Sequence, residues 1–88
     1  MLTLLKFKAD WCGPCKAMTP VINKLMEENK DVIFQEVDID NDPQLRAEYA
    51  IRSIPSFVVL KDRKEINRKV GSGTLSEMKE FLDECRGL

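Results

Sequence analysis

The 88-residue sequence contains no histidine. Without histidine the chain cannot build a Ser/His or Cys/His nucleophile pair, a metalloprotease histidine pair or an imidazole-based zinc site, which excludes most hydrolase classes. It also has no excess of positive charge, because 14 Lys and Arg are matched by 15 Asp and Glu. A net charge of −1 provides no basic field for a nucleic-acid backbone or an anionic membrane, so we expect neither partner.

Long apolar runs are missing as well. The longest, from Phe57 to Leu60, is far shorter than the roughly 20 residues that cross a bilayer. The first six residues have no basic start, and lysines interrupt the apolar stretch that they open, which is not the pattern of a secretion signal. We therefore expect a cytoplasmic location. The absence of repeats and linkers predicts one domain over residues 1–88.

Apolar periodicity predicts an alternation of strands and helices. Strands are expected at residues 3–7, 32–37, 56–60 and 65–70, and helices at about 12–29, 43–49 and 75–86. The first strand, helix and strand predict a parallel pair, and the short turn near Asp62 predicts an antiparallel hairpin. A mixed four-stranded α/β sheet follows, with the first strand in its centre.

Two of the three cysteines, Cys12 and Cys15, form a C-x-x-C pair. In a reducing compartment this spacing indicates redox chemistry or metal binding. Both sulfurs lie on one face of the first helical turn, close enough for a disulfide. Cys12 is expected to be the exposed attacking thiolate, because free N–H groups and the helix dipole favour its anion. Cys15, one turn inside, is expected to be the shielded sulfur that resolves a mixed disulfide.

The string Trp11-Cys12-Gly13-Pro14-Cys15-Lys16 resembles the active-site motif of the thioredoxin family. The similarity covers nearly the whole chain, through Pro20, Asp38-Ile39-Asp40, Ile54-Pro55 before an apolar strand, and Val70-Gly71. The resemblance implies a thioredoxin-like fold with strand order 2-1-3-4 and three flanking helices. It also implies a protein-disulfide reductase that works by dithiol–disulfide exchange through a mixed disulfide.

The same resemblance implies how clients bind. Pro55 would be a cis-proline beside the dithiol, and the backbone of Ile54 would pair with an extended client segment. Five further residues would line a shallow apolar groove: Trp11, Gly13, Pro14, Ile39 and Gly71. No bound cofactor is implied, since electrons come from a thioredoxin reductase that carries FAD and uses NADPH, or from an equivalent dithiol donor. The partners would be that donor and disulfide-containing proteins.

The family usually begins with an additional strand and helix, so the resemblance implies a short, minimal form. Strand 32–37 then becomes an edge of the sheet. Charged residues on it, such as Glu36, discourage pairing with another chain. We expect a monomer, and pairing of two edge strands in a dimer stays open.

Lys6 and Glu36 depart from the family pattern. Lys6 stands where the family has a buried Asp, and Glu36 stands where the family has the Lys partner of that Asp. By strand periodicity the two side chains can lie next to each other on one sheet face. We hypothesise that this exchanged pair lies beneath the dithiol, that the cation lowers the cysteine pKa values, and that Glu36 or water accepts the Cys15 proton. The alternative is that Lys6 reaches solvent and Glu36 is an ordinary edge charge.

Three other functions stay open at this point. A glutathione-coupled, glutaredoxin-like reductase fits the short length, although that family typically has Pro-Tyr between its cysteines. A zinc module would use Cys12, Cys15 and Cys85 but lacks a fourth ligand, and Cys85 is otherwise expected to be a buried apolar residue of the last helix. A non-catalytic interaction subunit would use the surface near Trp11 and Pro55 without redox turnover.

Overall fold

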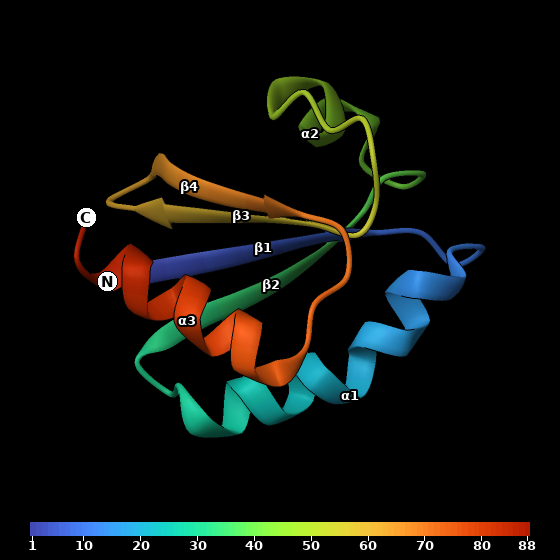
Figure 1. Cartoon of the computed structure of the whole chain (residues 1–88). Helices are drawn as coiled ribbons and strands as arrows, with labels where there is room; N and C mark the ends of the chain where they lie inside the picture. Colours follow the sequence, from blue (N-terminus) through green and yellow to red (C-terminus); the bar gives the residue numbers. More distant parts are fainter.

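Four strands form one mixed sheet in the computed structural model, which describes residues 1–88 (Figure 1). The strands are β1 (Leu2–Lys8), β2 (Val32–Asp38), β3 (Ser56–Lys61) and β4 (Lys64–Val70). The helices are α1 (Gly13–Glu28), α2 (Pro43–Glu48) and α3 (Leu75–Arg86). The order β2-β1-β3-β4, with β1 parallel to β2 and the other pairs antiparallel, confirms the predicted topology.

One apolar core lies between the sheet and the pair α1 and α3, which cover the same face (Figure 1). Leu25 of α1 and Met78 of α3 are fully buried there, against Leu4 and Phe57 of the central strands. The apolar spacing along α1 predicts one buried stripe of Met18, Val21, Ile22, Leu25 and Met26, but this is wrong at Met26, which is 43% exposed. Met26 follows Ile22 by four residues but lies at the edge of the buried face of α1, where it lines a surface cavity with Thr19 and Phe34.

A second core lies at the carboxyl end of β1, where the chain enters α1. It contains Phe7 of β1, Val58 of β3 and Ile51 from the segment after α2. The rings of Phe7 and Tyr49 are tilted with centroids 5.7 Å apart, a favourable geometry for an aromatic pair. Both cysteines of the C-x-x-C pair belong to this core. The dithiol is therefore embedded in packed apolar side chains at the strand end where the topology predicts a functional loop.

The sequence carries capping signals at the starts of two helices: Thr74-Leu75-Ser76-Glu77 predicts a capping box, and Asp42-Pro43 predicts an N-cap followed by proline. Thr74 and Glu77 form the predicted capping box, in which each side chain accepts a hydrogen bond from the backbone N–H of the other, and α3 ends at the C-cap Gly87. Asp42 is the N-cap of α2, but its side chain makes no capping hydrogen bond.

Pro20 lies inside α1, and Figure 1 shows the helix axis bending along its length, as the missing N–H of proline predicts. None of the helices has the length and apolar character needed to span a membrane.

Candidate active site

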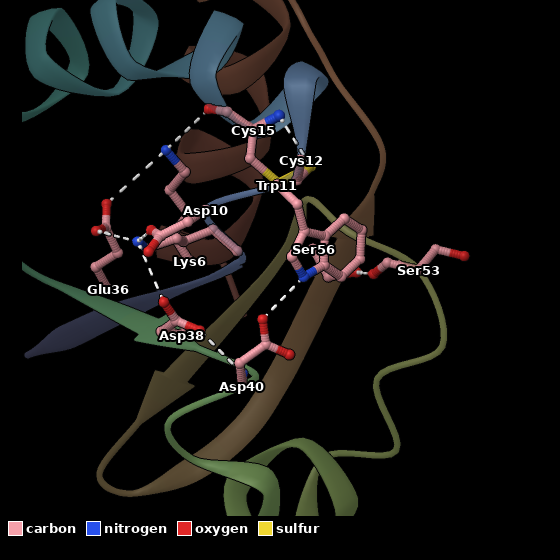
Figure 2. Close-up of a disulfide and its surroundings, with 11 residues drawn as sticks. Lys6, Asp10, Trp11, Cys12, Cys15, Glu36, Asp38, Asp40, Ser53 and Ser56 are labelled. Carbon is pink, nitrogen blue, oxygen red and sulfur yellow. Dashed lines mark hydrogen bonds and ion pairs between the residues drawn. A yellow bond between two sulfur atoms is a disulfide. The ribbon is translucent and has the colours of Figure 1, made fainter.

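Cys12 and Cys15 are joined by a disulfide at the start of α1, with their Cα atoms 5.3 Å apart (Figure 2). Cys12 is the N-cap of the helix and has an extended backbone, and its Sγ accepts a hydrogen bond of 3.1 Å from the Cys15 N–H. Pro14 fits the first turn because its missing N–H needs no partner there. A sulfur at this place receives the N–H groups and the positive dipole end of α1, which favour a thiolate.

The two sulfurs differ less in burial than the sequence predicts. Cys12 is 5% exposed and Cys15 is 2% exposed, so the expected exposure of Cys12 is wrong for this disulfide form. The physical reason is that Cys12 packs with Ala9 and Ile39 in the second core, with its sulfur bonded to Cys15. Cys12 still lies at the outer end of the turn and Cys15 at the inner end.

Trp11 dominates the surface next to Cys12. Its side chain is 68% exposed, and Gly13 and Pro14 beside it are exposed too. The indole Nε1–H donates to Asp40 Oδ2 at 2.8 Å, as Figure 2 shows. Sequence reasoning missed this role of Asp40, although the position after the end of β2, at the same end of the parallel pair as the dithiol, was a signal for it. An exposed indole held in one orientation gives a rigid apolar contact surface.

A loop before β3 brings Pro55 to the same end of the sheet. The Ile54–Pro55 peptide bond is cis, and Pro55 is buried. The Ser56 hydroxyl donates to the Ser53 carbonyl, and the Gly71 N–H donates to the Pro55 carbonyl at 2.8 Å. Gly71 has φ +93, a conformation that glycine adopts without steric cost. The backbone N–H and C=O of Ile54 make no hydrogen bond within the chain.

Ile39 differs from the other residues predicted to line a groove. Ile39 is buried in the second core. Its N–H donates to the Lys8 carbonyl, so the strand pairing of β1 and β2 continues past the end of β2. Ile39 therefore packs in the core beneath the disulfide and is not part of the exposed surface around it. None of the four cavities in the molecule is lined by Trp11, Pro14 or Ile54. The surface around the disulfide is therefore better suited to a protein segment than to a small molecule.

Lys6 lies beneath the dithiol, on the side of the sheet covered by α1. It is only 4% exposed, and its Nζ donates to the Cys15 carbonyl at 3.3 Å (Figure 2). Lys6 and Glu36 are register partners of β1 and β2, and Lys6 Nζ lies 4.0 Å from Glu36 Oε2. The predicted adjacency is therefore present, and the alternative in which Lys6 reaches solvent is wrong. Burial lowers the pKa of Lys6 from 10.5, and Glu36 partly opposes this effect.

Lys8 continues the charged cluster toward solvent. Its Nζ is 2.9 Å from Asp10 Oδ1, 3.6 Å from Glu36 Oε1 and 3.5 Å from Asp38 Oδ2. The hydrogen bond from Lys8 lowers the pKa of Asp10 from 3.8. Glu36 is thus shared by two lysines, and Lys6 also donates a hydrogen bond to the active-site helix α1.

Cys85 does not join the other cysteines. It is a free, fully buried thiol of the first core, while Cys12 and Cys15 belong to the second. No group of three or more Cys, Asp or Glu side chains is arranged to hold a metal ion. The three-cysteine zinc site considered from the sequence is therefore not formed.

A family model described as Thioredoxin matches residues 1–84. The chain belongs to the thioredoxin family. It is 46% identical over 70 residues to the thioredoxin of Chlamydia trachomatis, a match that spans 80% of this chain and 69% of that protein. With the thioredoxin of Mycoplasmoides gallisepticum it shares 37% identity over 79 residues, which cover 90% and 79% of the two chains.

Solved thioredoxin structures have the same fold. The match to thioredoxin NaTrxh of Nicotiana alata has a TM-score of 0.89 and 36% identity and covers 94% of this chain and 71% of that one. The match to the thioredoxin of Fasciola hepatica has a TM-score of 0.89, 34% identity and coverage of 94% and 79%. With Cys12 and Cys15 in the family's C-x-x-C position, the chain is a thiol-disulfide oxidoreductase that reduces protein disulfides. The glutaredoxin-like and non-enzymatic alternatives are not favoured.

Proposed function

We propose that Cys12 and Cys15 carry the reduction of client disulfides in two steps. The Cys12 thiolate attacks one sulfur of the client disulfide, which forms a mixed disulfide and releases the other client sulfur as a thiolate that takes up a proton. Cys15 then gives up its proton and attacks Cys12 Sγ, which expels the second client sulfur. The client gains two electrons and two protons, and the Cys12–Cys15 disulfide of the structure is the oxidised product.

The single observation that carries this assignment is the hydrogen bond from the Cys15 N–H to Cys12 Sγ at the N-cap of α1. It places Cys12, and not Cys15, where backbone donors and the helix dipole stabilise a thiolate. Cys15 lies within the first turn, within disulfide distance of Cys12 and behind it. This order supports attack by Cys12 and release by Cys15.

For client binding we propose the surface around the disulfide. Its residues come from three loops and the start of α1: Trp11, Gly13, Pro14, Ile54, Pro55 and Gly71, with Ile39 beneath them. The unpaired backbone groups of Ile54 support the pairing of an extended client segment there, since strand addition uses main-chain hydrogen bonds. The exposed indole of Trp11 supports apolar contact with the client beside the attacked disulfide.

The protein is proposed to work in electron transport and redox homeostasis of the cytoplasm, as a monomer. The unpaired Cys85 supports a reducing compartment, because free thiols persist there. Its electron donor is proposed to be a thioredoxin reductase with FAD and NADPH, or an equivalent dithiol donor, which reduces the Cys12–Cys15 disulfide after each turnover.

The variant Cys15→Ser tests the assignment, because it leaves the capturing sulfur and removes the releasing one. Incubated with a disulfide-linked peptide, it is expected to accumulate a one-to-one covalent adduct, which peptide mapping by mass spectrometry places on Cys12. Cys85→Ser is the matched control and is expected to turn over without an adduct. An adduct on Cys85, or a Cys15→Ser protein that captures nothing, would overturn the assignment.

A further inference from the structure

Lys6 is the only charged side chain buried in the molecule. The other buried polar residue, Ser56, is uncharged and hydrogen-bonded. A buried ammonium is costly unless it is paired with an anion, and charged residues are rarely buried unpaired. The groups around Lys6 therefore decide how much of the free-energy cost of burying its ammonium is offset.

The surroundings of Lys6 compensate its charge only in part. The Cys15 carbonyl accepts one hydrogen bond, and Glu36 lies at 4.0 Å with more than half of its side chain exposed to solvent. Glu36 is also drawn toward Lys8 at 3.6 Å. In the disulfide form, burial outweighs the attraction of Glu36 and lowers the pKa of Lys6. The site thus holds a cation without a close, buried counter-ion.

A small cavity of about 80 Å³ joins Lys6 to the resolving cysteine. Lys6 and Cys15 both line it. The other charged groups that face it are Lys8 of β1, Asp10 of the following loop, Lys16 of α1 and Glu36 of β2. On β3, the register partner of Lys6 is the apolar Phe57, so this position of β3 places no charged group beside Lys6. Cys15 is therefore the one group at this site that can gain a negative charge when the disulfide is reduced.

We propose that Lys6 is a positioning residue for the resolving step, in which its ammonium stabilises the Cys15 thiolate from below. The inference rests on the proposed roles of Cys12 and Cys15. Lys6 exchanges neither electrons nor protons: Cys15 gives its proton to water or to the Glu36 carboxylate, and the resulting thiolate attacks Cys12 Sγ. An opposite charge close to a thiol favours the ionised form of that thiol, and a stabilised reduced form makes the disulfide a stronger oxidant.

Glu36 has the opposite effect in this arrangement. As the counter-ion of Lys6 it weakens the field of the ammonium at Cys15. Loss of the Glu36 charge therefore shifts Cys15 ionisation and the redox equilibrium in one direction, and loss of the Lys6 charge shifts them in the other. A merely structural role of the pair predicts no such opposition of sign.

The first experiment measures Cys15 ionisation in a Cys12→Ser/Cys85→Ser background, where Cys15 is the only thiol, by the absorbance of the thiolate across pH. Lys6→Met is expected to lower the acid dissociation constant of Cys15 about tenfold, Glu36→Gln to raise it, and Lys6→Arg to keep it near the starting value. Lys24→Met is the matched control. It removes an exposed lysine from the same helix as Cys15, and this lysine pairs only with Glu27.

The second experiment uses the intact dithiol and its equilibrium with a reference dithiol. Lys6→Met is expected to shift this equilibrium about tenfold toward the oxidised protein, which equals about 30 mV for a two-electron couple, and Glu36→Gln toward the reduced protein. Reduction of a peptide disulfide by the unsubstituted protein is measured in parallel, so that failure of the exchange reaction is seen separately. If that reaction proceeds while Lys6→Met matches Lys24→Met in both measurements, or if Lys6→Met and Glu36→Gln shift the same way, the role of Lys6 is overturned.

Discussion

At the scale of single residues, the Cys12 side chain serves both as the cap of α1 and as the proposed nucleophile. Cys12 caps α1 with its sulfur, where Ser, Thr, Asp or Asn would be the usual choice, and the same sulfur is the proposed nucleophile. The capping position is useful for chemistry because its N–H donors stabilise an anion. A Cys12→Ser variant is therefore expected to keep the helix start while losing the attacking thiol.

Trp11 reports on this region because it is the only tryptophan. We expect its fluorescence to rise on reduction of the Cys12–Cys15 disulfide, since a disulfide next to an indole quenches its emission. Asp40→Ala removes the acceptor of the indole N–H, so the redox-dependent change is expected to shrink as the ring loses its fixed orientation. Asp42→Ala, which removes a nearby carboxylate from the same loop, is the control. Identical emission of the unsubstituted protein in both redox states contradicts the placement of the ring.

The sequence predicted some residue contacts better than others. Strand periodicity placed Lys6 beside Glu36 correctly, because the side-chain period of two and the parallel register leave little freedom. The contact of Trp11 with Asp40 joins two loops, and no periodicity governs loops. The burial of Cys12 was missed for a similar reason, since it depends on the side chains that the second core gathers around the turn.

At the scale of elements, sequence signals worked where the local chemistry is distinctive. The capping box of α3 is found as predicted, and the continuous apolar run of residues 57–60, which is typical of a strand covered on both faces, lies in β3 with Phe57, Val58 and Val59 fully buried. The β3–β4 hairpin is tighter than predicted, because Asp62 and Arg63 alone form the turn and both adopt positive φ. That conformation usually selects Asn-Gly or Asp-Gly, so Asp62-Arg63 indicated a turn but not this two-residue form. The register irregularity between Val59 and Leu60 likewise has no local signature.

The capping box predicts the stability of α3. Thr74→Ala removes the side-chain oxygen that accepts the Glu77 N–H, and we expect the free energy of unfolding to fall by about 1 kcal/mol. The measurement is urea denaturation followed by circular dichroism. Ser76→Ala, an exposed position two residues on, is the matched control and is expected to change little. Equal stability of the two variants would show that the box does not hold the helix.

The same box has a pH dependence. The hydrogen bonds from Thr74 hold the pKa of Glu77 below 4.5. The unfolded chain therefore binds the Glu77 proton more tightly than the folded chain does. The stabilisation by this carboxylate is present above pH 4.5 and is lost as pH falls through the lowered pKa.

At the scale of the whole molecule, the strand order followed from the sequence because few connections are allowed. A right-handed crossover fixed β1 beside β2, and a short hairpin fixed β3 beside β4. The resemblance to thioredoxins then supplied the pairing of β1 with β3, which no local pattern indicates. The sequence placed the Lys6–Glu36 pair beneath the dithiol, but neither route gave the extent to which Lys6 is buried, because that burial depends on elements distant in the sequence.

The incomplete compensation of the buried Lys6 charge predicts that Lys6 lowers the free energy of unfolding of the oxidised protein. Lys6→Met replaces the buried ammonium by an apolar group of similar length, and Glu36 keeps Lys8 and water as partners. We expect the free energy of unfolding of the oxidised protein to rise by roughly 1 kcal/mol at pH 7, as it often does when a buried charge gives way to an apolar side chain. Lys24→Met, at an exposed position, is expected to leave it nearly unchanged.

The pH dependence of this difference identifies its cause. Because burial lowers the pKa of Lys6 from 10.5, the unfolded chain binds this proton more tightly than the folded chain does. The stability of the unsubstituted protein therefore rises with pH between the lowered pKa and 10.5, while Lys6→Met lacks that increment. The advantage of Lys6→Met is expected to shrink as urea denaturation is repeated from pH 7 toward pH 10.5. An advantage that grows with pH, or a Lys6→Met protein less stable than the unsubstituted one at pH 7, would show that the ammonium stabilises the oxidised fold and that its burial carries no cost there.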